Sequence, residues 1–382
     1  MNGPEISPPE AEMRAVELND APAITKFLVG LGLAMPEGDT AIRKHWSNLW
    51  QDNPALKHHG DNPAFGWVLE DAGRIVGFFG NIPQVSYFGG RPVKVSSARA
   101  WAVEKEYRDH TPSLCEAFFG QDTADLVLIS SANAPAGKRC PEFGGSAMPQ
   151  PGYDEILYWG LNAPGLIRAG LRKKGHGGVA SWFGGILGGI VLNARMRLGG
   201  RRPFAALDGI RIIGLDGIDE RFDDLWQLKL KQVPDRLLAC RNGETLRWYF
   251  GLSGRSSETR VICLNRDGRL QGYAVVVRED APAIGLKRLK IADLFVAGDD
   301  PAVADALLTG AYEYGLAKRC HVLELIGLPE NLRHAALKHK PFSRPMAVFP
   351  FYFKALNPEL AGPLASADGW YVTAFDGDTT LL

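Results

Sequence analysis

The chain has 382 residues, of which 46% are hydrophobic and 23% are charged, and its 43 basic side chains balance 43 acidic ones. This composition excludes a disordered chain, a collagen-like protein and a small disulfide-stabilised scaffold. The five cysteines form no close pairs, and the first residues lack the charged and apolar regions of a signal peptide. We therefore expect a cytoplasmic protein with about two domains.

The zero net charge combines three unequal segments. Residues 1–160 carry a net charge of −7, residues 161–202 carry eight basic side chains and no acidic one, and residues 203–382 carry −1. Because the chain is not basic as a whole, we do not expect it to bind DNA. The basic segment in its middle favours an anionic partner, such as a phosphate-bearing ligand or a lipid surface.

Apolar periodicity and turn residues predict alternating strands and helices in the first half of the chain. The expected order is a strand, a helix, a two-stranded hairpin, a further strand, a helix and a buried strand. These elements are expected at residues 13–18, 21–33, 66–70 with 74–81, 92–103, 113–121 and 125–131.

The second half of the chain repeats this order. A hairpin, a strand, a helix and a buried strand are expected at residues 260–264 with 270–277, 289–296, 302–316 and 321–326, and a last strand at 370–375. Gly77 in the first hairpin precedes Val127 by 50 residues, and Gly272 in the second precedes Val322 by the same 50. Two copies of one α/β unit are the simplest interpretation of this spacing.

Residues 161–202 join the two predicted units. Residues 175–194 contain no charged side chain, but seven of them are glycine and the apolar part covers only residues 179–192. Because a membrane-spanning helix needs about 20 apolar residues, we do not expect a span. Two interpretations stay open: a helix packed between domains, or a helix that contacts a membrane surface through residues 179–202.

The segment that follows the first hairpin resembles a known family. It contains a strand that ends at Val103, the run EKEYRDHTPS at residues 104–113, and the strand DLVLISS followed by an alanine and Asn133. This order resembles the GNAT superfamily of acyl-CoA-dependent N-acetyltransferases over residues 13–150, with a weaker similarity at 203–356. The resemblance implies an α/β (α+β) fold with two GNAT-like mixed sheets, flanked by helices and joined by a basic helical linker. The domains expected are residues 13–160, 161–202 and 203–382.

The resemblance also implies where acyl-CoA binds. In the family, a loop of the pattern Arg/Gln-x-x-Gly-x-Gly/Ala holds the pyrophosphate at a helix N-terminus, where free N–H groups and the helix dipole favour a phosphate. The corresponding run here has Arg108 at the first position and Thr111 and Ser113 at the positions of the small residues. A capped helix start with an exposed arginine is the alternative interpretation. The residues expected to bind acetyl-CoA or another acyl-CoA are Val103, Arg108, Asp109, His110, Thr111, Ser113 and Leu114.

Three residues are expected to be catalytic on the same resemblance. Asn133 matches the family's asparagine after the buried strand, and Cys140 stands where the family has a tyrosine that returns a proton to the CoA thiolate. Glu104 is the candidate base that accepts the proton of the amine. A buried, inert cysteine and a solvated turn glutamate are the alternatives. No metal site is expected.

The second copy departs from the family pattern. Residues 297–304 contain no arginine and include Asp299 and Asp300, which would repel a phosphate. Asp293 in the preceding strand is either an acceptor-facing carboxylate or a structural acid. We therefore expect a GNAT-type acyltransferase that moves an acetyl or longer acyl group to a small-molecule amine, either an aminosugar or an amino-acid-type substrate, with acyl-CoA in the first copy. The alternatives are a Fem-like peptidyltransferase that uses aminoacyl-tRNA, and a catalytically silent binding module at a membrane surface.

Overall fold

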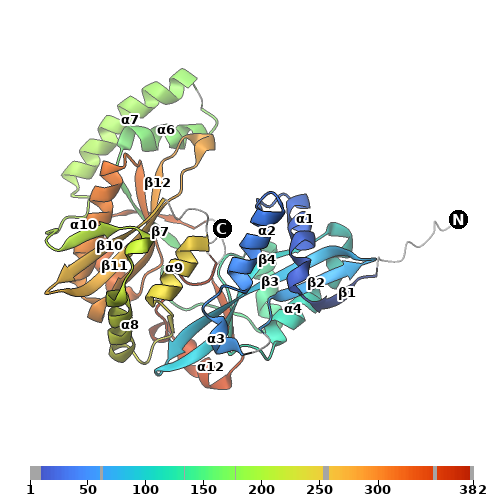
Figure 1. The fold of residues 1–382 in the computed structure, drawn as a ribbon. Coiled ribbons are helices and arrows are strands. Elements are labelled where there is room, and N and C mark those ends of the chain that lie inside the picture. Colours follow the sequence, from blue (N-terminus) through green and yellow to red (C-terminus); the bar gives the residue numbers. More distant parts are fainter. Residues whose placement is uncertain are drawn as a thin grey trace. The chain divides into compact units, whose positions relative to one another are not determined.

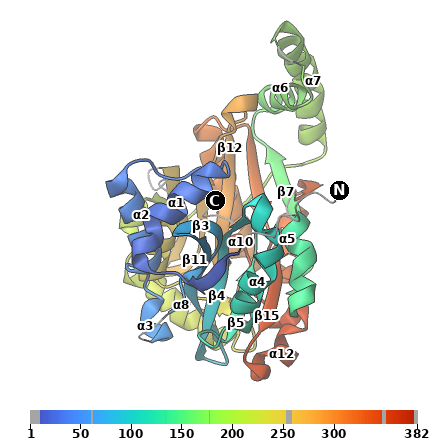
Figure 2. The same ribbon diagram turned by 90° about the vertical axis from the view of Figure 1, so that its right-hand side faces the viewer.

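The computed structural model describes residues 10–60, 63–132, 134–176, 178–252, 258–346 and 351–378. The chain forms two compact units. The first unit contains Met1–Pro149 and Val348–Gly369, and the second contains Gln150–Ala347 and Trp370–Leu382. Each unit is built on one mixed sheet that carries helices on its faces (Figure 1 and Figure 2).

The sheet of the first unit has the strand order β1-β2-β3-β4-β5-β15-β6. Neighbouring strands are antiparallel except for β4 and β5, which are parallel. The strands are β1 (Glu12–Ala15), β2 (Gly66–Asp71), β3 (Arg74–Phe88), β4 (Arg91–Val103), β5 (Leu126–Ile129), β6 (Ser146–Ala147) and β15 (Tyr352–Ala355).

Helices cover both faces of this first sheet. Trp46 meets Phe78 edge-on at 5.9 Å on the face of α1 and α2, and Phe118 of α4 stacks on Phe79 at 4.3 Å on the other face. Successive residues of a strand point to opposite faces, so Phe78 and Phe79 each anchor one helical layer. The helices of this unit are α1 (Ala21–Gly30), α2 (Asp39–Trp50), α3 (Leu56–His59), α4 (Thr111–Gly120), α5 (Ala134–Arg139) and α12 (Pro358–Leu364).

The sheet of the second unit has the order β8-β10-β11-β12-β13-β7-β14, again with one parallel pair, β12 and β13. Its strands are β7 (Glu155–Gly160), β8 (Ile210–Ile213), β10 (Thr259–Arg266), β11 (Arg269–Arg278), β12 (Arg288–Val296), β13 (Val322–Ile326) and β14 (Phe342–Pro345), and the unit also contains the short β9 (Leu238–Ala239). Its helices are α6 (Ala163–Lys173), α7 (Gly178–Leu198), α8 (Glu220–Gln232), α9 (Gly243–Leu252), α10 (Pro301–Ala317) and α11 (Glu330–Lys338).

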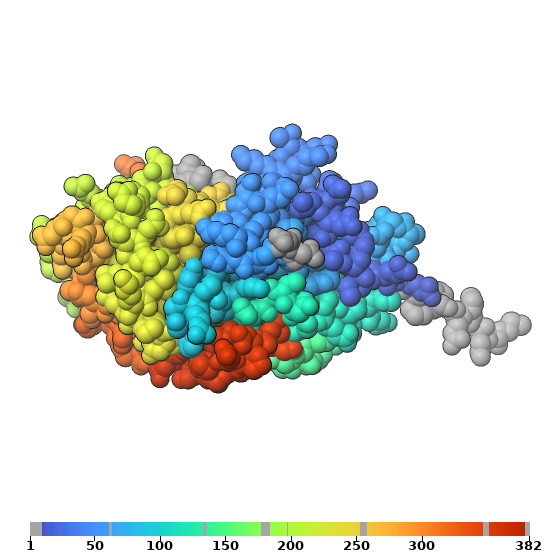
Figure 3. Space-filling view, turned by 60° about the horizontal axis from the view of Figure 1, so that its bottom comes forward, coloured from blue at the N-terminus to red at the C-terminus, as the bar shows by residue number. Residues whose placement is uncertain are grey.

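The two sheets share strand order and strand directions, but each contains one strand from a distant part of the chain. β7 follows β6 in sequence yet pairs with β13 and β14. β15 follows β14 in sequence yet pairs with β5 and β6. The two units therefore differ from the expected ranges 13–160 and 203–382 at these two segments. In Figure 3, the red segment of residues 351–369 lies against the blue-green residues of the first unit.

The segment of residues 370–375, predicted as a last strand, forms none. The hydrogen-bond partners of its backbone are mainly side chains. The Gln150 amide donates to the Val372 carbonyl at 2.9 Å and accepts from the Val372 N–H at 3.0 Å. The Asp376 carboxylate accepts from the Thr373 N–H at 2.8 Å. The strand prediction was wrong because apolar alternation indicates burial here, whereas the backbone partners are not a neighbouring strand.

Candidate active site

The two parallel strands of the first sheet separate before they end. β4 pairs with β5 only from Val95 to Ser97, whereas it continues along β3 to Val103. In the part of the chain that the structure describes, no strand pairs with residues 98–103 on the β5 side. A stretch of β4 roughly 20 Å long at the usual strand rise is thus open on one edge.

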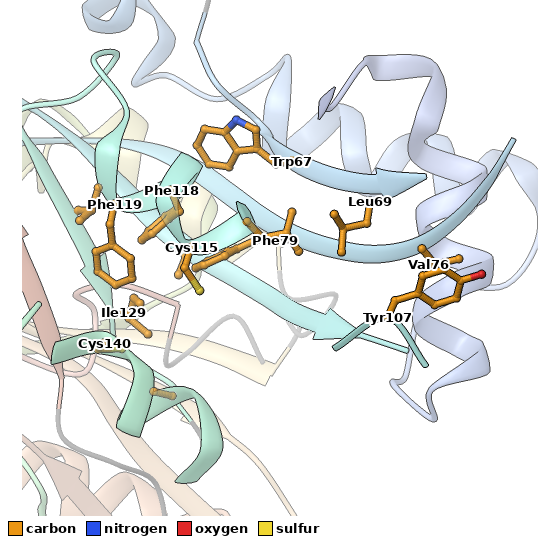
Figure 4. Packing of buried hydrophobic residues seen from close by; sticks show 14 residues of the cluster. Trp67, Leu69, Val76, Phe79, Tyr107, Cys115, Phe118, Phe119, Ile129 and Cys140 are labelled. Atoms are coloured by element: carbon orange, nitrogen blue, oxygen red, sulfur yellow. The ribbon is translucent and has the colours of Figure 1, made fainter. Parts of the chain in front are cut away.

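A β-bulge and an aromatic stack fix this open end of β4. The register of β3 and β4 shifts between Phe78 and Gly80, and Ala100 has a positive φ of 52°. Trp101 stacks on Phe79 at 4.8 Å, and Phe79 stacks in turn on Phe118. Figure 4 shows Phe79 and Phe118 together in the core of this face. The bulge bends the strand, and the stack holds it in one conformation.

The predicted pyrophosphate loop lies directly after this strand. It forms a short 3-10 turn, Lys105–His110, and then the first turn of α4, with a proline among the first helical residues as expected. The N-cap residue His110 makes no side-chain capping hydrogen bond. The Thr111 N–H donates to the Arg108 carbonyl, and Pro112 has no N–H. The Ser113 N–H and the positive end of the helix dipole remain at this helix start. This helix start can therefore accept an anion.

The predicted acyl-CoA residues differ in exposure. Leu114 is completely buried in the core, so its side chain cannot face a ligand. The Ser113 hydroxyl donates to the His110 carbonyl at 2.8 Å. The remaining side chains are exposed in the case of Arg108 and Asp109, and partly exposed in the case of Val103, His110, Thr111 and Ser113.

Cys140 is packed in the core of the first unit. It begins the 3-10 turn Cys140–Phe143, is completely buried and contacts the Ala136 carbonyl at 3.4 Å. Burial raises the pKa of its thiol to about 12. Because an ordinary thiol has a pKa of about 8.5, this group is a poor proton donor to a CoA thiolate. This packing favours the alternative of an inert cysteine. Asn133 lies outside the described residues.

Tyr352 brings a hydroxyl group to the neighbourhood of Cys140. It pairs with Ile129 at the end of β5 and packs against the core cluster that contains Cys140. Burial, and then the charge of an ionised Cys140, raise the pKa of Tyr352. Sequence reasoning missed this residue because it lies more than 200 positions beyond β5. Only the pairing of β15 with β5 brings the two segments together.

Glu104 follows β4 directly, and its backbone N–H donates to the Val76 carbonyl at 2.9 Å. Its carboxylate forms an ion pair with Arg74 at 2.6 Å and is 26% exposed. Both side chains line a surface hollow of about 690 Å³, together with Lys26 and Lys105. The carboxylate is therefore reachable from solvent but already engaged by a guanidinium.

Three polar side chains near the separation of β4 and β5 were not assigned a role from the sequence. His45 Nε2, Ser97 Oγ and Arg99 Nη1 are buried atoms without a hydrogen-bond partner among the described residues. Ser97 and Arg99 lie two positions apart and so share one face of β4. Burial, and then the charge of Arg99, lower the pKa of His45 to about 4. In the sequence, Ser97 and Arg99 are marked only as two polar residues at alternate positions of a largely apolar strand.

The equivalent gap in the second sheet is filled by the chain itself. β12 pairs with β13 only from Arg288 to Ile291 and then continues beyond β13. The Tyr371 hydroxyl donates to the Leu294 carbonyl at 3.1 Å. The segment of residues 370–376 thus occupies the place that lies open beside β4 in the first unit.

Asp293 lies at this filled gap and is a structural acid. It is buried and accepts hydrogen bonds from Thr373 at 2.7 Å and Tyr273 at 3.0 Å. The completely buried Arg241 pairs with it at 3.1 Å. With all these partners inside the protein, the carboxylate does not face an acceptor.

Two carboxylates, those of Asp299 and Asp300, lie in the loop before α10. Asp300 caps this helix by accepting from the Ala302 N–H at 2.8 Å. Asp299 accepts from the buried Lys229 at 2.5 Å and pairs with Arg236 at 3.3 Å. The helix start that corresponds to the uncapped end of α4 is therefore already supplied with negative charge.

No group of three or more His, Cys, Asp or Glu side chains in the described ranges could hold a metal ion.

Solved structures with a similar fold extend over most of the chain. A protein from Enterococcus faecalis V583, described as of unknown function and a probable N-acyltransferase, has a TM-score of 0.57 and 8% identity, covering 91% of this chain and 73% of that one. A GCN5-related N-acetyltransferase from Anabaena variabilis ATCC 29413 has a TM-score of 0.56 and 10% identity, with coverages of 91% and 73%. Another from Kribbella flavida has a TM-score of 0.55 and 13% identity, with coverages of 92% and 72%.

No family model and no curated protein sequence matches the chain. At 8–13% identity, the likeness to solved structures concerns the fold. The chain therefore has the fold of the GCN5-related N-acetyltransferases.

Proposed function

We propose that the protein is an acyl-CoA-dependent N-acyltransferase that transfers an acetyl or longer acyl group to an amine, with acyl-CoA bound in the first unit. The contrast between the two units carries this proposal. Beside β4 the strand edge is open and α4 lacks a side-chain cap. Beside β12 the gap is filled by Tyr371, and Asp300 caps α10.

The open edge and the helix start suit two parts of acyl-CoA. The amide groups of the pantetheine arm can pair with the free edge of β4 as an added strand would. The pyrophosphate can bind at the positive end of the α4 dipole, with the Ser113 N–H and the exposed Arg108 as donors. In this proposed arrangement the thioester would lie near the bulge at Ala100.

The proton steps are assigned to accessible groups. Glu104 remains the candidate base because its carboxylate reaches the surface hollow. Tyr352 replaces Cys140 as the candidate donor to the CoA thiolate, because its ring is only partly buried whereas the thiol is sealed in the core.

Isothermal titration calorimetry with acetyl-CoA tests the proposal. We expect Ser113→Asp to weaken binding at least about tenfold, because it places at α4 the negative charge that Asp300 supplies at α10. Arg108→Ala should weaken binding to a smaller extent. The matched control, Asp300→Ala in the second unit, should leave the affinity unchanged.

Two outcomes would contradict the proposal. A folded wild-type protein that gives no binding heat at millimolar acetyl-CoA is not such an enzyme. Salt-sensitive binding of tRNA in place of acetyl-CoA would favour the Fem-like peptidyltransferase.

A further inference from the structure

The acceptor site can be described further, and this inference rests on the proposed function. His45, Ser97 and Arg99 lie on the face of the first sheet that α1 and α2 cover, where β4 leaves β5. Ser97 is the last residue of β4 that pairs with β5, and Arg99 is the next residue on the same face. The cluster therefore adjoins the place where the thioester is expected.

The surroundings of this cluster are apolar. Phe78 contacts Trp46 edge-on at 5.9 Å, and a Cβ added to Gly80, which pairs with Arg99, would lie 2.6 Å from the Phe78 ring. Charges and hydrogen bonds act more strongly beside such rings than in water. A buried polar atom without a hydrogen-bond partner raises the free energy of the folded protein. A ligand that supplies the missing partner removes this penalty and therefore binds more tightly.

The three groups offer complementary chemistry. Arg99 and the Ser97 hydroxyl can donate hydrogen bonds to an anion, and a guanidinium suits a carboxylate in particular. The imidazole of His45 is neutral at physiological pH, so one of its ring nitrogens accepts a hydrogen bond. An acceptor nitrogen can be that donor.

We propose that the acceptor is an amino-acid-type amine, whose carboxylate binds Arg99 and Ser97 while its nitrogen donates to His45. The acceptor ammonium first loses one proton to the base. The nitrogen then attacks the thioester carbon, so that a C–N bond forms and the C–S bond breaks. The second proton leaves the new amide nitrogen and ends on the CoA sulfur, which gives the free thiol.

The test measures thiol release with matched acceptors: an amino acid, its carboxamide, the corresponding amine without the carboxyl group, and an aminoalkyl phosphate. We expect the amino acid to be used with a kcat/KM about 10- to 100-fold above that of the two analogues without a carboxylate. Arg99→Ala should remove this preference by raising KM for the amino acid much more than KM for the two analogues without a carboxylate. Arg99→Lys should retain part of the preference.

The outcomes separate this inference from the proposed function. If acetyl-CoA binds but the wild-type enzyme shows no preference for an anionic amine, or Arg99→Ala slows all acceptors equally, the inference is rejected alone. A preference for the aminoalkyl phosphate over the amino acid would overturn the carboxylate assignment. The comparison between acceptors within one variant controls for loss of folding.

A second inference comes from the α6–α7 hairpin, which is independent of the acyl-CoA site. Glycines on one side of α7 let it lie close to α6: a Cβ at Gly188 would be 3.1 Å from Ile167, and one at Gly189 would be 2.7 Å from Pro164. Figure 1 shows α7 as the outer of the two helices, beyond α6 as seen from β12. The other side of α7 is therefore free of α6.

That other side carries large apolar side chains in contact with water. Leu187, Ile190, Val191 and Leu198 are 66%, 63%, 69% and 91% exposed. Their spacing of three, four and eleven positions places them along one side of the helix. We call these four residues the apolar stripe; the 77% exposed Phe204 follows it in the chain.

The charges around the apolar stripe have one sign. Residues 161–202 contain eight basic side chains and no acidic one. Those that the structure describes as exposed are Arg172, Lys173, Lys174, Arg195 and Arg202. A second copy of the same surface would be repelled by these like charges, whereas an anionic surface would be attracted.

We propose that the apolar stripe docks the protein on an anionic membrane surface. The apolar side chains would enter the boundary between headgroups and acyl chains, and the basic side chains would stay at the level of the phosphates. The helix would lie in the plane of the surface, since none of the described helices is long and apolar enough to cross a membrane.

Sedimentation with phosphatidylcholine vesicles, with or without phosphatidylglycerol, tests this docking. We expect the protein to pellet with the anionic vesicles only, and each basic residue near the surface to strengthen binding about fivefold at low salt. The triple variant Leu187→Ser, Ile190→Ser, Val191→Ser should abolish pelleting. Leu228→Ser, which changes a 45% exposed leucine of α8, is the matched control and should pellet normally.

Pelleting that survives the triple substitution, or its absence with anionic vesicles, would overturn this proposal. So would analytical ultracentrifugation that shows the wild type to be a dimer and the triple variant a monomer, because a second copy would then cover the stripe.

Discussion

Arg241 connects the C-terminal segment to the middle of the second unit. Its guanidinium is completely buried and donates to Asp293 at 3.1 Å, to Asp376 at 2.9 Å and to Thr373 at 3.2 Å. Two carboxylates around one guanidinium compensate its charge in a place where water cannot. This residue therefore helps to keep the gap beside β12 closed.

Replacement of Arg241 by Met should be severely destabilising. The change leaves Asp293 and Asp376 buried without a cation, which typically costs about 3 to 5 kcal/mol. Urea unfolding measures the loss. Arg278→Met is the control, because its ion pair with Asp280 lies near the surface and should contribute less than about 1 kcal/mol. Equal losses in both variants would contradict this account.

His45 should make the stability of the first unit depend on pH. Its folded pKa of about 4 lies below the ordinary value of 6.5, so the folded state disfavours the proton. The contribution of the neutral imidazole to the free energy of unfolding is fully present above pH 6.5 and is lost as the pH falls toward 4. Between pH 7.5 and 5, the wild type should lose about 2 kcal/mol more than His45→Gln, measured by urea unfolding at both values. Parallel losses would show that the imidazole titrates normally.

Substitutions of Tyr352 and Cys140 are expected to have opposite effects on catalysis and stability. Tyr352→Phe removes only a hydroxyl and should lower kcat by about 100-fold if that group is the proton donor. Cys140→Ala should leave kcat unchanged and lower the free energy of unfolding by about 1 to 2 kcal/mol, since it removes a buried sulfur. Steady-state kinetics and urea unfolding of both variants decide. A loss of kcat confined to Cys140→Ala would restore the thiol as the donor.

At the scale of elements, the turns of the two main hairpins differ at one residue. Ala72 and Asp267 occupy equivalent positions with positive φ values of 47° and 51°. Aspartate and asparagine tolerate this conformation, whereas alanine does not gain a local hydrogen bond there. Ala72→Asn should therefore raise the free energy of unfolding by about 0.5 to 1 kcal/mol, measured by urea unfolding. Asp267→Asn should be neutral, and a destabilised Ala72→Asn would refute the argument.

Local signals predicted most elements of both units. Asp267-Gly268 between two apolar runs is enough to predict the hairpin of β10 and β11. A proline near the start of α4 is enough to predict where that helix begins. All these signals lie within a few residues of each other. The tandem character followed from the 50-residue spacing.

The features missed from the sequence depend on contacts between distant segments. Neither Tyr352 nor the filling of the β12 gap by Tyr371 leaves a local pattern, because each results from packing against a strand made earlier in the chain. The burial of Cys140 likewise follows from the core that surrounds it. The role of Arg99 depends on where β4 leaves β5, which pairing alone decides.

At the scale of the whole molecule, the exchange of β7 and β15 makes each sheet depend on both halves of the chain. A fragment of residues 1–149 lacks β15 and leaves β5 and β6 without the strand that joins them. We expect this fragment to be rapidly cleaved by proteases. Fusion of residues 348–369 to it through a flexible linker should give a protease-resistant product. A resistant fragment without the fusion would contradict the dependence.

The exchange also has a consequence during protein synthesis. β5 leaves the ribosome more than 200 residues before β15, an interval of roughly 10 to 45 s at ordinary elongation rates. Through this interval the apolar strand Leu126–Ile129 has an unpaired edge, which is a template for pairing with other nascent chains. Translation speed in the second half of the message thus governs how long the first half is at risk, and a chaperone that shields this edge would protect it.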